Sequence, residues 1–166
     1  EIRIRDWSSD VCSSDLLNFT GGQANSTIKI ETTNKRAFID DVVVTASAPT
    51  PSITSSGSLV AVNTVYGTAS PSPASFTVSG ANLAAGITVV PPTGFEVSAS
   101  NPNSFAGKGN SVIVGSAGTV ASTTIFVRLA ADTDAGTYSG DIVCSSVGAS
   151  NATVATVSST VSAKPI

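Results

Sequence analysis

Short alternations of apolar and polar residues recur along the chain from residue 52 to residue 163. Ser75–Ser79, Ile87–Val89 and Gly94–Ser98 each alternate with a period of two, and Gly, Pro, Asn and Ser are frequent between them. A period of two indicates a strand with one buried face, and no segment repeats with the helical period. The pattern predicts about eight strands, the others lying near Ile53 and at 111–114, 124–129, 137–145 and 153–161. This rhythm is typical of an antiparallel β-sandwich.

The apolar positions of these strands define one expected core face. Its members are Phe76, Val78, Ile87, Val89, Phe95, Val97, Val112, Val114, Ile125, Val127, Leu129, Tyr138, Ile142, Cys144, Val157 and Val161. The opposite positions are mostly Ser, Thr and Gly. The sequence therefore predicts a core large enough for a marginally stable domain of about 110 residues.

Two turn sequences fit the same architecture. Pro91–Gly94 places a proline and then a glycine where a tight turn needs a fixed φ and a positive φ. Asp134–Tyr138, which contains Gly136, precedes a strand as an immunoglobulin-type tyrosine corner does. We expect the phenol of Tyr138 to reach the backbone of the preceding loop. These positions are therefore expected to be structural.

Residues 17–46 predict a β-hairpin. Ser26–Thr32 alternates strictly, Ala37–Thr45 is a second strand-like run, and Thr33–Lys35 forms a turn between them. Two strands do not bury enough surface to stand alone, so the hairpin is expected to be the end of a larger domain. Residues 47–51 form a Pro-containing linker, and residues 164–166 are expected to begin another.

Several sequence segments within residues 52–163 resemble a recurring immunoglobulin-like module of secreted, Bacteroidetes-type multidomain proteins. The matching segments are Phe76–Leu83, Ile87–Ser98, Thr124–Leu129 and Ala135–Gly140. The resemblance implies an all-β, immunoglobulin-like sandwich without catalytic residues, and Cys144 departs from the commoner Thr or Val. Arg36–Thr45 resembles the closing strand of secreted bacterial jelly-roll domains. That second resemblance implies calcium-ligand positions at Asp40 and Asp41.

Residues 1–16 fit no fold element, because they follow no hydrophobic period and repeat Ser-Ser-Asp. Asp6–Leu16 is identical to one translated frame of a common short-read sequencing adapter, so we expect this segment to be non-native. The alternative is a natural Ser/Asp-rich tail. Without residues 1–16, six of the eight basic and seven of the eleven acidic residues remain, and the formal net charge changes from -3 to -1. Cys12 is then no partner for Cys144.

Composition excludes several classes of function. Only 11% of the residues are charged and none is His, which removes His-dependent triads and every His metal site. The basic residues are scattered, so no nucleic-acid interface is expected. No apolar run is long enough to span a membrane. Asp132 and Asp134 share a loop and are a weak calcium candidate; the alternative is a solvated turn.

The polar segment 98–110, with Phe105 near its centre, is the one candidate recognition loop. The alternative is a variable surface loop whose Phe105 packs back onto the sheet. These observations predict a monomeric, non-enzymatic spacer that holds neighbouring domains of one extracellular or cell-surface polypeptide apart, with no required cofactor. The alternatives are a module that binds extracellular glycans through its end loops, and an accessory fragment of a larger extracellular hydrolase.

Overall fold

The computed structural model describes residues 48–165, and this part of the chain is all-β. It contains no helix, as the absence of a helical period predicted. Its strands are β1 (Ser52–Ser56), β2 (Thr64–Val65), β3 (Ala74–Leu83), β4 (Ile87–Val90), β5 (Phe95–Ala99), β6 (Val112–Val114), β7 (Gly118–Leu129), β8 (Gly136–Tyr138), β9 (Asp141–Ser145), β10 (Ala152–Ala155) and β11 (Ser159–Ser162). The prediction of an all-β fold is confirmed.

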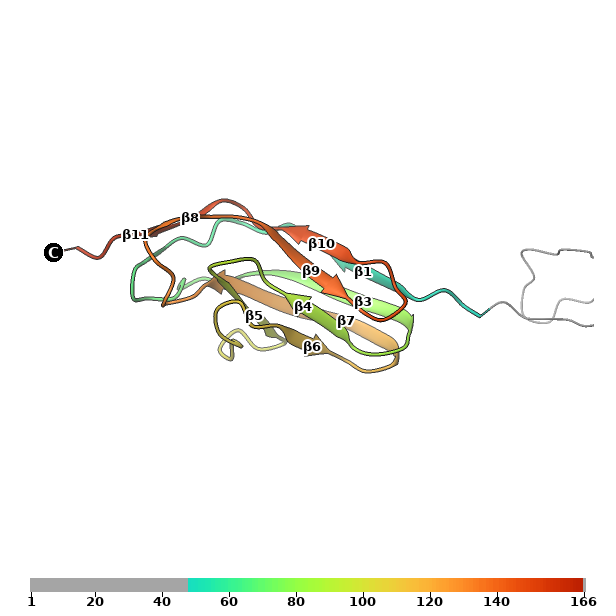
Figure 1. Ribbon diagram of the computed structural model, residues 1–166. Coiled ribbons are helices and arrows are strands. Elements are labelled where there is room, and N and C mark those ends of the chain that lie inside the picture. The colour runs from blue at the N-terminus through green and yellow to red at the C-terminus, as the bar shows by residue number, and fades with distance from the viewer. Residues whose placement is uncertain (1–47, 166) are drawn as a thin grey trace, which may run out of the picture. The chain divides into compact units, whose positions relative to one another are not determined.

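Two four-stranded antiparallel sheets make up most of this region (Figure 1). One has the strand order β1-β3-β7-β5 and the other the order β10-β9-β4-β6. The longest pairing joins β3 to β7, which have 10 and 12 residues. Asn82 has a φ of 56° at a register shift near the end of this ladder, a conformation that asparagine tolerates better than most residues.

Both sheets contribute to one hydrophobic core, as in a β-sandwich. The alternation places Phe76, Val97 and Ile125 from one sheet, and Ile87 and Ile142 from the other, in a single buried cluster. Most core positions expected from the pattern are buried. Val112 and Tyr138 are instead half-buried at the margin of the cluster.

Val157 was expected in the core, and that prediction is wrong: 45% of its surface is exposed. The physical reason is an interruption of the expected strand 153–161. The amide of Gly140 donates a hydrogen bond to Oγ1 of Thr156, and the amide of Thr156 donates one to the carbonyl of Gly140. The ladder is interrupted over residues 156–158, and the alternation shifts by one residue there. Val154 and Val161 are therefore the buried positions on either side.

The same interruption divides each of two expected strands. The predicted strand 137–145 becomes β8 and β9, and the predicted strand 153–161 becomes β10 and β11. β8 and β11 continue with β2 as a three-stranded sheet. In it, β11 pairs antiparallel with β8 and parallel with β2.

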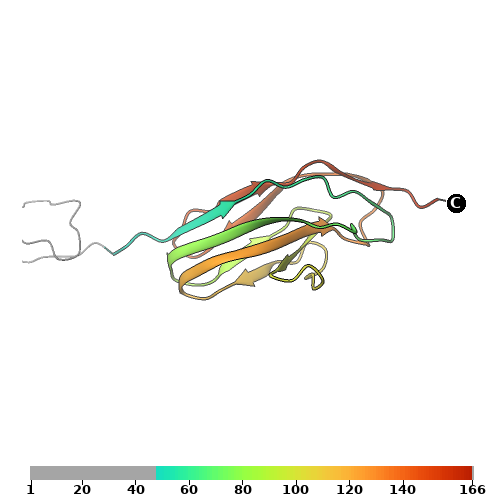
Figure 2. The same ribbon diagram turned by 180° about the vertical axis from the view of Figure 1, so that it is seen from behind.

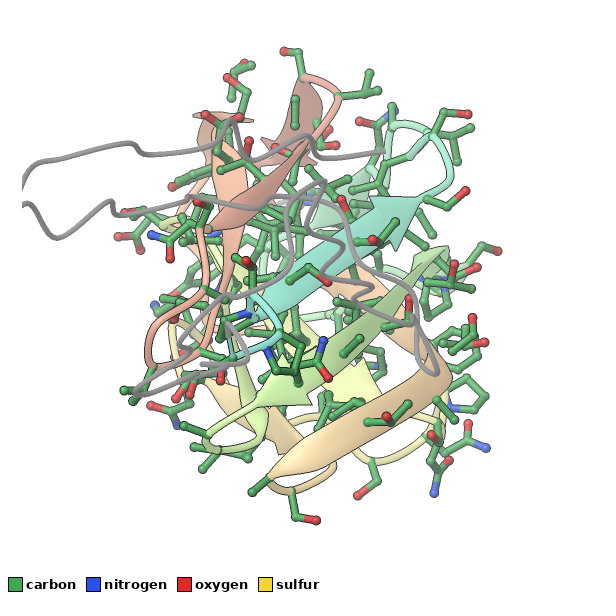
Figure 3. The ribbon with its side chains drawn as sticks, turned by 90° about the vertical axis from the view of Figure 1, so that its right-hand side faces the viewer. Atoms are coloured by element: carbon green, nitrogen blue, oxygen red, sulfur yellow. The ribbon has the colours of Figure 1, made fainter. Side chains whose placement is uncertain are left out.

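The chain enters this region at one end and leaves it at the other (Figures 1 and 2). Figure 3 views it from the entry end, with side chains projecting from both sheets. Residues 48–165 lie within one compact unit. The non-native segment predicted at 1–16, and the hairpin predicted at 17–46 with Asp40 and Asp41, lie outside the described residues.

Candidate functional site

Phe105 lies on the loop of residues 100–110, which connects β5 to β6 and is here called the 100–110 loop. Its ring is half-buried and lies against Arg128 of β7, whose guanidinium carbon is 3.9 Å from the ring centroid. A guanidinium at this distance over an aromatic face makes a cation–π contact. Of the two interpretations of Phe105 from the sequence, the geometry matches the one in which it packs back onto the sheet.

Arg128 also pairs with Glu96 on the neighbouring strand. The two residues are direct partners in the register of β5 and β7, and their side chains point to the outer face because Val97 and Val127 point inward. The Nε of Arg128 donates to Oε1 of Glu96 at 2.7 Å. Glu96 is 7% exposed, so its carboxylate depends on this partner. The pair leaves this part of the face without net charge.

Ser98 is the second buried polar residue on the outer face of β5. Its hydroxyl lies within hydrogen-bond distance of the backbone oxygens of Asn101 and Ser104. The outer face of β5 is thus covered by the 100–110 loop, which explains why Phe95–Ser98 is buried at every position. The strict alternation of this segment predicted a polar exposed face, and the covering loop is what the pattern did not indicate.

Asp132, one of the two acidic residues of its loop, has a basic partner within the domain. The ammonium of Lys108 lies 3.2 Å from the carboxylate of Asp132 and donates to the backbone oxygen of the same residue at 2.6 Å. Among residues 48–165, no three acidic, Cys or His side chains converge on a point where a metal could bind. Calcium takes six or more oxygens, so Asp132 and Asp134 by themselves do not make a site.

Tyr138, Gly94 and Thr133 form a packed corner at one end of the sandwich. The hydroxyl of Tyr138 donates to the backbone oxygen of Asp134 at 2.9 Å, which is the contact expected from the sequence. Gly94 has a φ of +87°, as the turn requires, and its carbonyl accepts from the hydroxyl of Thr133 at 2.8 Å. Gly136 lies beneath the phenol ring. All these contacts hold the connection between β7 and β9.

Cys144 is fully buried on β9. Desolvation raises the pKa of its thiol from 9.0 to about 11. A thiol with this pKa is protonated at neutral pH, whereas the reactive form of cysteine is the thiolate. Cys144 therefore behaves as a small apolar core residue.

Ser70 has a role that the sequence did not indicate. It is 1% exposed, donates to the backbone oxygen of Val62 at 2.6 Å and accepts from the amide of Leu129 at 3.1 Å. Ser159, fully buried on β11, accepts from the amide of Val62 at 2.9 Å. These hydroxyls therefore tie the segments on both sides of β2 to the core, at Val62 before the strand and at Ser70 after it. Ser70 lies in a polar stretch without periodicity, so no pattern could identify it.

An open groove of about 610 Å³ runs between the end of β1 and the edge of β10. It is lined by small residues and a few aliphatic ones: Ser55, Ser56, Gly57, Ser58, Leu59, Thr153, Val154, Ala155 and Val157. The lining carries no ionisable side chain, so it offers no acid, base or metal ligand.

Comparison with known proteins adds no family to this picture. No protein-family model matches the chain, and no curated protein or solved structure matches it either. Within residues 48–165, no helix has the length and apolar character needed to cross a membrane.

Proposed function

We propose that residues 52–163 act as a non-catalytic spacer module in a secreted or cell-surface bacterial multidomain protein. The observation that carries the proposal is the path of the chain, which enters the sandwich at one end and leaves it at the other (Figures 1 and 2). Domains attached before and after such a module are held apart by its length. Pro-containing linkers at 47–51 and 164–166 fit the two attachment points.

The order of the strands supports an immunoglobulin-like assignment for the module. In a constant-type immunoglobulin domain, one sheet has the first, second, fifth and fourth strands and the other has the third, sixth and seventh. With β6 treated as an added edge strand, β1-β3-β7-β5 corresponds to the first sheet and β4, β9 and β10 to the second. Tyr138 lies between the fifth and sixth strands, where a tyrosine corner is expected. The extra β6 and the division of the last two strands depart from that plan.

The chemistry of the surface also supports a spacer. The carboxylate of Glu96 is paired with Arg128, and Asp132 is paired with Lys108. The thiol of Cys144 is buried. The outer positions of β1 and β3 are mostly Ser and Thr. We propose that the partners of this monomeric module are the neighbouring domains of the same polypeptide, in the extracellular space or at the cell surface.

Two measurements test the spacer function. Limited proteolysis of the whole chain is expected to leave a resistant product that spans about residues 50–163, because a hydrogen-bonded sandwich protects its backbone. Rapid cleavage between β3 and β9 would contradict the proposal. Fluorophores attached at T50C and A163C in a C12S background are expected to give one narrow distance distribution. A broad distribution would show that the module does not hold its two ends at a fixed separation.

Glycan binding through the 100–110 loop has weaker support, because Phe105 is half-buried against Arg128. A carbohydrate array with the chain and its Phe105→Ala variant separates the two functions. Binding that the substitution abolishes would favour the glycan-binding alternative. An accessory role in a larger extracellular hydrolase is compatible with the spacer proposal, since the catalytic group would then belong to another domain.

A further inference from the structure

β5 is an edge strand, and the backbone of an uncovered edge strand can form hydrogen bonds with a strand of another molecule. It ends the order β1-β3-β7-β5, so only its β7 side is paired within the sheet. On the other side, an edge strand presents unpaired amides and carbonyls that attract a further strand from a second molecule. β5 contains no proline and has the apolar Phe95 and Val97, both of which favour pairing.

The 100–110 loop occupies this edge. The amide of Ala106 donates to the carbonyl of Val97 at 3.1 Å, and the amide of Gly109 donates to the carbonyl of Phe95 at 2.9 Å. The amide of Phe95 is used by the turn carbonyl of Pro92 at 3.1 Å. Three of the four edge-facing backbone groups of Phe95 and Val97 therefore have partners without any neighbouring strand.

Side chains fix the loop in this position from three directions. Phe105 of the loop stacks against the guanidinium of Arg128. Lys108 of the loop contacts the carboxylate and the backbone oxygen of Asp132. The hydroxyl of Ser98 on β5 lies within hydrogen-bond distance of two backbone oxygens of the loop. Phe105 and Lys108 are both contributed by the loop and both contact residues outside it. They are anchors that can be removed without altering the core of the sandwich.

We propose that the 100–110 loop is a strap that caps the β5 edge and prevents this module from pairing edge to edge with a second copy of itself. The capped carbonyls of Phe95 and Val97 are the groups that such a pairing would use. A second copy is the favoured occupant because the same edge on two molecules is self-complementary in an antiparallel, two-fold arrangement. Such a strap would control how two copies of the chain associate, whether or not the module acts as a spacer.

The test compares the whole chain with variants that loosen or remove the strap and with a matched control. The double variant Phe105→Ala/Lys108→Ala removes both anchors. The matched control Tyr66→Ala/Lys164→Ala removes one aromatic ring and one lysine from other exposed positions. The third variant replaces residues 101–109 with five Gly/Ser residues and removes the strap outright. Hydrogen exchange at the amides of Ala106 and Gly109 reports opening of the strap, and sedimentation equilibrium reports association.

The double variant is expected to exchange these two amides roughly tenfold faster or more than the control. It is also expected to change from monomer to dimer at concentrations where the parent chain and the control are monomers. The strap-less variant is expected to dimerise at least as strongly. Ser98→Lys on that background is expected to restore the monomer, because edge pairing would bring like charges on the outer faces of the two β5 strands together. A folded strap-less variant that stays monomeric up to high concentration would overturn the proposal. Dimerisation that Ser98→Lys leaves intact would also overturn it, because the contact would then lie elsewhere.

Discussion

Gly94 lies directly against the ring of Tyr138: a Cβ atom on Gly94 would be 2.7 Å from Cδ1 of the tyrosine. This close approach is a direct contact between the turn before β5 and the tyrosine before β9, which the sequence indicated as two separate features. Both positions are constrained by the same contact, because the turn also requires a φ of +87° at Gly94. A side chain at position 94 would collide with the ring of Tyr138 unless the ring moved away from the turn.

The Gly94→Ala variant is expected to lose about 2–4 kcal/mol of unfolding free energy, from the positive φ and the clash together. Gly67 is a matched control, because its φ is also +87° and a Cβ there would meet nothing within 4 Å. Gly67→Ala should cost only about 1 kcal/mol. Urea unfolding of both variants measures the difference. Equal losses would show that contact with Tyr138 contributes nothing.

The Ser70→Ala variant is expected to lose about 2–3 kcal/mol, because it leaves the amide of Leu129 and the carbonyl of Val62 buried without their partner. Ser58→Ala is the control, at an exposed serine, and should change stability by less than about 0.5 kcal/mol. Thermal unfolding of the two variants provides the comparison. A Ser70→Ala variant as stable as the control would refute the role assigned to this hydroxyl.

The Arg128→Met variant is expected to lose about 2–3 kcal/mol, because it leaves the carboxylate of Glu96 without a cation. The loss stays below that of a fully buried pair, since the side chain of Arg128 is 27% exposed. The double variant Glu96→Gln/Arg128→Met should recover most of it. Lys108→Met, at a more exposed pair, serves as the control and should cost less than about 1 kcal/mol. A double variant no more stable than Arg128→Met would contradict this account.

Cys144 is expected to make stability fall between pH 9 and 11. Burial raises the pKa of the thiol from 9.0 to about 11, so in this window the unfolded chain releases a proton that the folded chain retains. The contribution is complete below pH 9 and decreases by roughly 1.4 kcal/mol per pH unit as the pH rises. The difference between the parent chain and Cys144→Ala, measured by urea unfolding from pH 8 to 10.5, isolates this group from the tyrosines. A difference independent of pH would exclude it.

The same thiol should be inert in the folded protein. In a Cys12→Ser background, Cys144 is expected to react with a maleimide only after denaturant is added, because both burial and protonation oppose reaction. Labelling as fast as that of a free thiol under native conditions would show that β9 opens readily.

The sequence predicted the strands that alternate strictly and missed the features that depend on distant contacts. Phe76, Val97 and Ile125 were placed in the core correctly, because a period of two with one buried face is a local property. Val157 was misplaced because Gly140 and Thr156, 16 residues apart, interrupt the ladder. The contact of Tyr138 with the preceding loop was predicted from the local sequence Asp134–Tyr138. The contacts of Arg128 with Phe105 and Glu96 could not be predicted in this way, because they depend on the register of β5 and β7.

The parallel pairing of β2 with β11 has a consequence for how the module bears tension. The chain enters at one end and leaves at the other, so a pull on the segments before β1 and after β11 would act along the module. Because β2 and β11 run parallel, such a pull slides one strand along the other. All the hydrogen bonds between them are then loaded together rather than broken one after another. The contact between β2 and the last strand, β11, is thus arranged in shear under such a pull.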